Sequence, residues 1–138
     1  MSGETVTSKS ALQFTNDNKK AYAFSGYIDV DNNETKLLEF NTNSEYIDAF
    51  ISVSNASGSG DDMRYYIYYN NVIVFSWYYD SPSYTGNLAT TPIPLIIPPF
   101  TTVKITGDNQ SSGSSRPHTA AVAGTVGMAQ RVGNLVDE

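Results

Sequence analysis

The sequence has 138 residues with 8 Lys and Arg against 14 Asp and Glu, so the formal net charge at pH 7 is −6 with the single histidine neutral. This length indicates one domain, and the sequence contains no cysteine, which excludes disulfide frameworks, thiolate metal sites and cysteine nucleophiles. The acidic balance argues against binding to nucleic acid or to an anionic membrane, because both depend on clustered Lys and Arg.

The composition favours strands over helices. Charged residues make up only 16% of the chain, whereas tyrosine alone supplies 10 residues. Tyr and Thr suit the pleated, half-buried surface of a sheet, and Asn, Gly and Ser suit turns. We therefore expect an all-β fold.

The chain begins with a polar segment over residues 1–20. Its larger hydrophobic residues are Leu12 and Phe14, which point the same way if the chain is extended. We interpret this segment as an extended N-terminal arm and expect the folded domain to begin at residue 21. Such an arm becomes ordered when it binds a partner, so Leu12 and Phe14 are candidate contact residues.

Three strands are expected in the first half of the domain. Residues 21–30 alternate between two faces, and residues 35–40 form a second short strand after an Asp-Asn-Asn turn. The clearest period of two lies in residues 47–53, where four apolar side chains occupy alternate positions: Ile47, Ala49, Ile51 and Val53.

The most informative local unit is MRYYIYYNNVIVFSWYY, residues 63–79. Two runs of aromatic and β-branched residues flank Asn70 and Asn71, and asparagine tolerates the positive φ angles that a type I′ turn needs. The pattern therefore predicts a β-hairpin with these two asparagines at its turn.

A two-residue turn at these positions pairs Tyr69 with Val72 and Ile67 with Val74. One face of the hairpin then carries five large side chains: Tyr66, Tyr68, Ile73, Phe75 and Trp77. Both faces are largely apolar, so the hairpin either lies at the centre of a sandwich or presents aromatic surface to a partner. Four of its residues are candidate partner contacts: Tyr66, Tyr68, Phe75 and Trp77.

The second half of the chain is rich in Pro, Gly and Ser. Prolines cannot donate to a ladder, so the proline-bounded segment is expected to be an edge strand or a bend. The small residues near the end predict a closely packed last strand. We expect a loop over residues 80–91, the proline-bounded segment over 95–97 and a strand over 100–106. A second loop over 107–117, the last strand over 118–128 and a tail over 129–138 follow.

These elements amount to about eight short strands separated by turns, a pattern typical of an antiparallel β-sandwich. Eight strands favour a jelly-roll-like topology, and an immunoglobulin-like or other Greek-key sandwich stays open. The expected organisation is an N-terminal arm over residues 1–20, a sandwich domain over 21–128 and a C-terminal tail over 129–138.

Catalytic residues are sparse in the sequence. The only histidine is His118, which lies near a Ser-rich loop, and no Gly-x-Ser-x-Gly elbow is present. Because the sequence offers one histidine and no catalytic motif around it, His118 is interpreted as a loop or strand residue and not as a general base. We expect a protein that is not an enzyme and that needs no cofactor.

Acidic residues gather in one turn region. Asp29, Asp31 and Glu34 could offer several oxygen ligands to Ca²⁺. The spacing lacks the glycine and terminal acid of an EF-hand, and a solvated acidic turn explains the same residues, because Asp and Asn favour turns for backbone reasons. No metal site is therefore assigned, and these three residues are retained as a weak calcium candidate.

The abundant aromatic residues fit either a protein interface or a surface on which sugars stack, and they also fit the core of a sandwich. Three segments carry a resemblance to a known class of proteins: AYAFSGYIDVDNNETKLLEF, YYIYYNNVIVFSWYY and IPLIIPPFTTVKITG. Over residues 21–128 the chain resembles small β-sandwich structural proteins of tailed bacteriophage virions, especially head-decoration (cement) proteins.

The resemblance implies a location on the phage head, after synthesis in the host cytoplasm. It further implies binding to the major capsid protein or other virion subunits, as a homo-oligomer, through a terminal arm and a face of the sandwich. The alternative is a carbohydrate-binding or host-attachment module of a tail or fibre. A glycan-binding role would use the tyrosines and Trp77 as stacking platforms.

Overall fold

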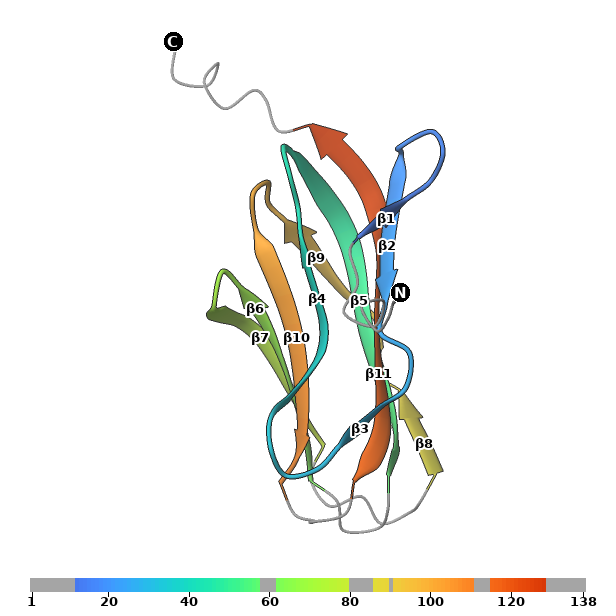
Figure 1. Cartoon of the computed structure of the whole chain (residues 1–138), viewed down its shortest axis with the longest axis vertical. Helices are drawn as coiled ribbons and strands as arrows, with labels where there is room; N and C mark the ends of the chain where they lie inside the picture. Colours follow the sequence, from blue (N-terminus) through green and yellow to red (C-terminus); the bar gives the residue numbers. More distant parts are fainter. Residues whose placement is uncertain (1–11, 58–61, 80–85, 90, 111–114, 129–138) are drawn as a thin grey trace, which may run out of the picture.

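The computed structural model describes residues 12–57, 62–79, 86–89, 91–110 and 115–128, and every regular element among them is a β-strand (Figure 1). The strands form two antiparallel sheets. The large sheet contains β1 (Gln13–Phe14), β2 (Lys20–Phe24), β3 (Ile28–Val30), β5 (Glu45–Ser57), β8 (Gly86–Ala89), β9 (Ile93–Ile97) and β11 (Arg116–Met128). The small sheet contains β4 (Thr35–Asn41), β6 (Met63–Tyr69), β7 (Val72–Tyr79) and β10 (Thr102–Asn109).

The connectivity is that of a jelly roll. The small sheet has the order β4-β10-β6-β7, and the large sheet has the order β1-β2-β11-β5-β8. Strands β2 and β3 both pair with β11, and β8 and β9 both pair with β5, so each pair acts as one interrupted strand. Counted in this way, each sheet has four strands, with β1 added at one edge of the large sheet, and the two sheets have the strand orders of a jelly roll. The predicted all-β sandwich with jelly-roll topology is confirmed.

The core lies between the two sheets. Ile47, Ala49, Ile51 and Val53 of β5 are all buried, so the predicted alternation of this strand is confirmed. The small sheet contributes its own inward-facing side chains: Leu37, Leu38, Phe40, Tyr65, Ile67, Val103 and Ile105. Because one face of each sheet is apolar, packing the two faces together removes both from water.

The last strand packs closely, as its small residues predict. A Cβ placed on Gly124 of β11 would lie 2.3 Å from the backbone oxygen of Asp48 on the neighbouring strand β5. Only glycine fits such an approach of two backbones. The residues of the expected tail, 129–138, lie outside the described residues.

The predicted strand over residues 21–30 is interrupted in the structure. β2 ends at Phe24 and β3 begins at Ile28, and Gly26 between them has φ +73°, a left-handed conformation that glycine adopts without strain. The backbone N–H of Ser25 still donates to Ala120 of β11, so both halves stay on the same neighbouring strand.

Two predicted loops contain strand residues. β8 lies within the expected loop 80–91 and pairs with the end of β5, and β10 extends to Asn109, beyond the predicted end at residue 106. These segments have weak local signals, and pairing with a long neighbouring strand holds them in the sheet.

The described part of the expected arm folds back on the sandwich. Gln13 and Phe14 pair with Tyr22 and Ala21 as strand β1, and Leu12 packs against the core. The domain therefore begins earlier than residue 21. Residues 1–11 lie outside the described residues.

None of the described residues forms a helix long and apolar enough to cross a membrane.

Candidate partner-binding surfaces

The hairpin of β6 and β7 contains a β-bulge that changes which residues share a face. Asn70 and Asn71 have φ values of 50° and 70°, so the predicted turn is confirmed, as is the pairing of Tyr69 with Val72. Beyond it the register shifts, and Ile67 lies opposite Phe75 and not opposite Val74 as predicted. The extra residue reverses the orientation of the rest of β7.

Phe75 and Trp77 consequently face the core and not the outer surface. Trp77 lies opposite Tyr65, with ring centroids 6.2 Å apart at an interplanar angle of 89°, and it lies 5.0 Å from the ring of Phe75. Both residues pack against the core cluster. The prediction that they share a face with Tyr66 and Tyr68 is wrong.

The outer face of the small sheet carries a tyrosine cluster, defined here as Tyr66, Tyr68 and Tyr78. The ring of Tyr66 lies 6.4 Å from each of the other two. Two cations cover parts of this cluster, because Lys104 lies 4.5 Å from the centroid of Tyr68 and Arg64 lies 4.6 Å from that of Tyr78. The three rings thus form a packed surface with one cation beside each of its outer members, Tyr68 and Tyr78.

Glu34 connects the turn before β4 to this cluster. Its carboxylate accepts hydrogen bonds from the hydroxyl of Tyr68 at 2.5 Å and from the hydroxyl of Thr106 at 2.6 Å. Burial acts to raise the pKa of Glu34, but these two bonds and the charge of Lys104 together lower it below its ordinary value. Burial and the bond to Glu34 raise the pKa of Tyr68 to about 12.

The weak calcium candidate is not assembled in the structure. Glu34 is engaged with the small sheet, Asp31 accepts a hydrogen bond of 2.9 Å from the backbone N–H of Asn33, and Asp29 lies on β3 opposite Pro117. In the part of the chain that the structure describes, no group of three or more His, Asp or Glu side chains is placed to hold a metal ion.

The single histidine is part of the interior. His118 is 0% exposed, and its ring lies 5.3 Å from that of Tyr65. The hydroxyl of Tyr65 in turn accepts a hydrogen bond from the side-chain amide of Asn55. His118 therefore belongs to a buried polar cluster between the sheets, on β11 and not in a loop.

A second exposed surface lies on the outer face of the large sheet. Tyr22, Ala123, Phe50 and Pro94 are aligned across strands β2, β11, β5 and β9, and we call these four residues with Phe24 the apolar row. Phe50 is 56% exposed and Phe24 is 57% exposed, and the rings of Tyr22 and Phe24 lie 5.3 Å apart. Exposed apolar side chains contiguous across four strands are typical of an interaction surface.

The sequence prediction missed the apolar row. The residue in the sequence that could have indicated it is Phe50, which lies between Asp48 and Ser52 on the polar side of an otherwise regular alternation. A large aromatic residue in a polar register of a half-buried strand indicates an outward-facing apolar contact.

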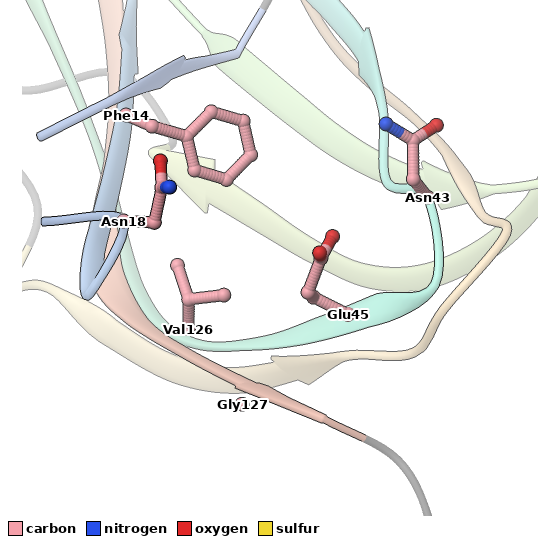
Figure 2. A pocket seen from close by; sticks show the side chains of 6 residues that line it. All are labelled: Phe14, Asn18, Asn43, Glu45, Val126 and Gly127. Carbon is pink, nitrogen blue, oxygen red and sulfur yellow. The ribbon is translucent and has the colours of Figure 1, made fainter. Parts of the chain in front are cut away.

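One end of the sandwich holds an open pocket of about 460 Å³ (Figure 2). The ring of Phe14 and the carboxylate of Glu45 point into it. Its other lining residues come from the β1–β2 turn, the turn before β5 and the end of β11: Asn18, Asn43, Val126 and Gly127. Of the two arm residues expected to contact a partner, Phe14 is 39% exposed at this pocket, whereas Leu12 packs against the core.

Comparisons with known proteins assign no family to this chain. No family model matches the sequence, and a search of curated proteins also finds no match. Among solved structures, the chain is similar to part of dimeric latent PorU from Porphyromonas gingivalis, with 14% identity over 80% of this chain and 13% of that chain and a TM-score of 0.47. It is also similar to part of the insecticidal delta-endotoxin Cry8Ea1 from Bacillus thuringiensis, with 16% identity over 72% of this chain and 19% of that chain and a TM-score of 0.41.

Proposed function

We propose that this protein is a non-enzymatic structural protein of a tailed-phage virion, a decoration protein that binds the outer surface of the head. The observation that carries the proposal is the apolar row on the outer face of the large sheet. Its proposed occupant is the major capsid protein of the shell, and the small sheet then faces away from the shell.

The chemistry of the apolar row favours a protein partner. Phe24 and Phe50 are each more than half exposed, and burying them against another protein releases ordered water and stabilises the complex. The net charge of −6 opposes approach to nucleic acid or to an anionic lipid surface. The burial of His118 in the interior supports a structural role for the one histidine.

The row can be tested by serine substitutions on particles that lack the protein. Phe50→Ser and Phe24→Ser are expected to lower the affinity for such heads by about tenfold each, or about 1.4 kcal/mol, when binding is measured by co-sedimentation. Phe100→Ser is the matched control, because Phe100 is 74% exposed but lies outside the row. Equal binding by all three variants and the unchanged protein would exclude the row as the contact surface.

A deletion that tests the role of the arm must be shorter than the predicted arm of residues 1–20. Removing residues 1–20 would also remove β1 and the core contact of Leu12, whereas removing residues 1–11 retains both. If the arm contributes to attachment, the 1–11 deletion lowers occupancy on the head without lowering the melting temperature. Unchanged occupancy would show that the sandwich alone makes the contact.

A second candidate function is glycan binding by a tail or fibre module, and the tyrosine cluster is the observation that favours it. Arg64 and Lys104 beside the cluster would suit acidic sugars. Against this role, the same two cations lie over ring faces of Tyr78 and Tyr68 that a sugar would need. A glycan array probed with and without a calcium chelator tests the candidate, and no binding in either condition would reject it.

A further inference from the structure

One core-facing position of the large sheet carries a charge. Side chains on one face of a strand recur every second residue, so Glu45 shares the inward face of β5 with Ile47, Ala49 and Ile51. The last three are buried, whereas Glu45 is half-buried and points into the pocket at the end of the sandwich (Figure 2). Because withdrawing a charge from water is costly, a carboxylate at such a position needs a partner.

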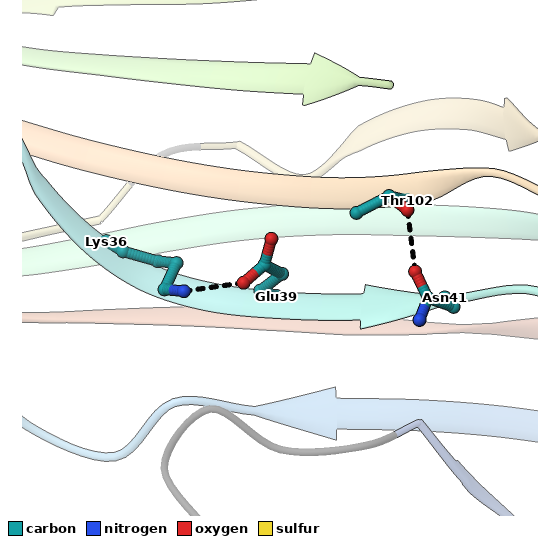
Figure 3. A network of polar contacts seen from close by, with 4 residues as sticks. All are labelled: Lys36, Glu39, Asn41 and Thr102. Carbon is teal, nitrogen blue, oxygen red and sulfur yellow. Dashed lines mark hydrogen bonds and ion pairs between the residues drawn. The ribbon is translucent and has the colours of Figure 1, made fainter. Parts of the chain in front are cut away.

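The other two glutamates among the described residues already have partners. On β4, the carboxylate of Glu39 lies 2.5 Å from the ammonium group of Lys36 (Figure 3). Glu34 accepts two hydrogen bonds from the small sheet. No residue in the described part of the chain donates a hydrogen bond to the carboxylate of Glu45 or forms an ion pair with it. This carboxylate is therefore available to a ligand in the pocket.

An apolar wall faces the same pocket. Phe14 lies opposite Ala21 in the register of β1 and β2, and Ala21 is buried in the core, so Phe14 also faces inward. Its ring is nevertheless 39% exposed, and Figure 2 shows it pointing into the pocket. Val126, which lies opposite Ile47 of β5, extends this wall. The pocket thus combines an aromatic and aliphatic wall with one carboxylate.

Two side-chain amides line the pocket from the turns around it. Asn18 lies in the β1–β2 turn, where its backbone N–H donates to Thr15 at 2.8 Å. Asn43 lies in the turn before β5, where its carbonyl accepts from the N–H of Phe100 at 2.8 Å. These bonds hold the backbone of both turns, and each amide offers one acceptor oxygen and two donor hydrogens. Pockets of this volume with a few polar groups on an apolar wall are typical of small-ligand sites.

We propose that this pocket binds an organic cation, an ammonium or guanidinium group carried on an apolar stem. The carboxylate of Glu45 accepts charge-assisted hydrogen bonds from the cation, and the amide oxygens of Asn18 and Asn43 accept from its remaining N–H groups. The stem lies against Phe14 and Val126. The face of the Phe14 ring also attracts a cation.

Charge selects a cation over other ligands. A neutral ligand that filled the pocket would withdraw the Glu45 carboxylate from water without a counter-charge. An anion would be repelled by this carboxylate and by a chain of net charge −6. The pocket lies at the end of the sandwich, whereas the apolar row lies on the outer face of the large sheet. Binding of the cation therefore does not depend on the decoration role.

Titration with n-butylguanidinium, followed by amide chemical shifts in NMR spectra, tests the site. The neutral probe of nearly the same shape is n-butylurea. We expect the cation to bind about tenfold more tightly than n-butylurea, and Glu45→Gln to weaken binding of the cation by about tenfold.

The matched control is Glu39→Gln, which removes the same charge from the outer face of the small sheet and should leave the affinity unchanged. Failure of the cation to bind, equal affinities of the two probes for the unchanged protein, or equal affinities of the two variants for the cation would overturn the proposal.

Melting temperatures separate a ligand-binding role of Glu45 from a structural one. Glu45→Gln breaks no hydrogen bond or ion pair within the described ranges of the chain, so without ligand it should melt at the same temperature as the unchanged protein or higher. Saturating n-butylguanidinium should raise the melting temperature of the unchanged protein more than that of Glu45→Gln. A lower melting temperature of the ligand-free variant would contradict the availability of this carboxylate.

A peptide probe distinguishes the two sources of such a cation, a basic side chain of another protein and a free small molecule. The probe is a blocked tripeptide with one arginine between two glycines, which carries the same guanidinium group as n-butylguanidinium. Binding at least as tight as that of n-butylguanidinium would support an arginine side chain as the occupant, and weaker binding would support a free cation. In both cases Glu45→Gln should weaken the tighter probe, and an unchanged affinity would overturn the site.

Discussion

The hydroxyl of Tyr68 on β6 donates a hydrogen bond of 2.5 Å to the carboxylate of Glu34, which lies 34 residues earlier in the turn before β4. The hydroxyl of Thr106 on β10 donates to the same oxygen at 2.6 Å. One carboxylate thus joins the acidic turn to two strands of the small sheet. The interaction gives Glu34 a structural role in place of the calcium ligation that the sequence suggested.

Replacing Tyr68 by Phe should destabilise the fold by about 0.5 to 1 kcal/mol, because one charge-assisted but solvent-exposed hydrogen bond is lost. Urea unfolding measures this change. Tyr27→Phe is the control, since Tyr27 is 82% exposed and removal of its hydroxyl should leave stability unchanged. Equal effects of the two substitutions would show that the bond to Glu34 contributes nothing.

The lowered pKa of Glu34 makes part of the stability depend on pH. The carboxyl group has an ordinary pKa of 4.5 and a lower pKa in the folded protein. Its contribution is therefore fully present above about pH 4.5 and is lost as the pH falls through the folded-state pKa. The free energy of unfolding of Glu34→Gln should accordingly converge on that of the unchanged protein as the pH is lowered from about 7 to about 3. A difference that stays constant over this range would contradict the assignment.

The inward orientation of Trp77 predicts opposite outcomes for two adjacent aromatic residues. Trp77→Ala removes a ring that packs against Tyr65 and Phe75 and should cost about 2 to 3 kcal/mol in unfolding free energy. Tyr78→Ala, at a position 55% exposed on the other face, should cost less than about 1 kcal/mol. In a register without the bulge, Tyr78 would face the core and Trp77 would face solvent, so Tyr78→Ala would then cost more stability than Trp77→Ala. Thermal unfolding of the two variants therefore distinguishes the two registers.

The sequence predicted elements whose signals are local. The alternation of apolar and polar residues in β5 predicts correctly which of its side chains are buried in the core. The Asn70-Asn71 pair likewise predicts the two positive φ angles in the turn between β6 and β7. The bulge in β7 has no such signal. Its neighbours Ile73, Val74 and Phe75 are all large and apolar, so nothing in their order indicates which residue is the extra one.

Other features depend on partners far away in the sequence. β8 is a strand because it pairs with the end of β5, and β1 is a strand because it pairs with β2. Neither segment has a strong strand propensity of its own. The apolar row is of the same kind: its members come from four strands and become neighbours only through the register of the large sheet. Sequence periodicity shows which face a residue occupies but not which residues of other strands lie beside it.

The turn of the hairpin offers a test of backbone conformation. Asn71 has φ 70°, where asparagine and glycine are tolerated but a residue such as alanine is strained. Asn71→Ala should destabilise the protein by about 1 kcal/mol, whereas Asn71→Gly should retain or raise its stability. Equal melting temperatures for the two variants would contradict a left-handed residue at this position.

Gly124 and Gly127 of β11 have different neighbours: backbone atoms surround the first and a side chain surrounds the second. Substituting alanine at each position compares the cost of crowding a backbone with the cost of crowding a side chain. A Cβ at Gly124 would meet the backbone of Asp48 and Ala49, at 2.3 and 2.7 Å, and these atoms move only if β5 and β11 separate. At Gly127 the obstacle is the ring of Tyr46, 2.4 Å away, and a side chain can rotate aside.

Gly124→Ala should therefore cost about 3 kcal/mol or more in unfolding free energy, and Gly127→Ala about 1 kcal/mol. Because Gly124 adjoins Ala123 of the apolar row, separation of β5 from β11 should also weaken any contact made by that row. The larger loss at Gly124 is expected in urea unfolding at neutral pH. A larger loss at Gly127 would contradict the close approach of the two central strands of the large sheet.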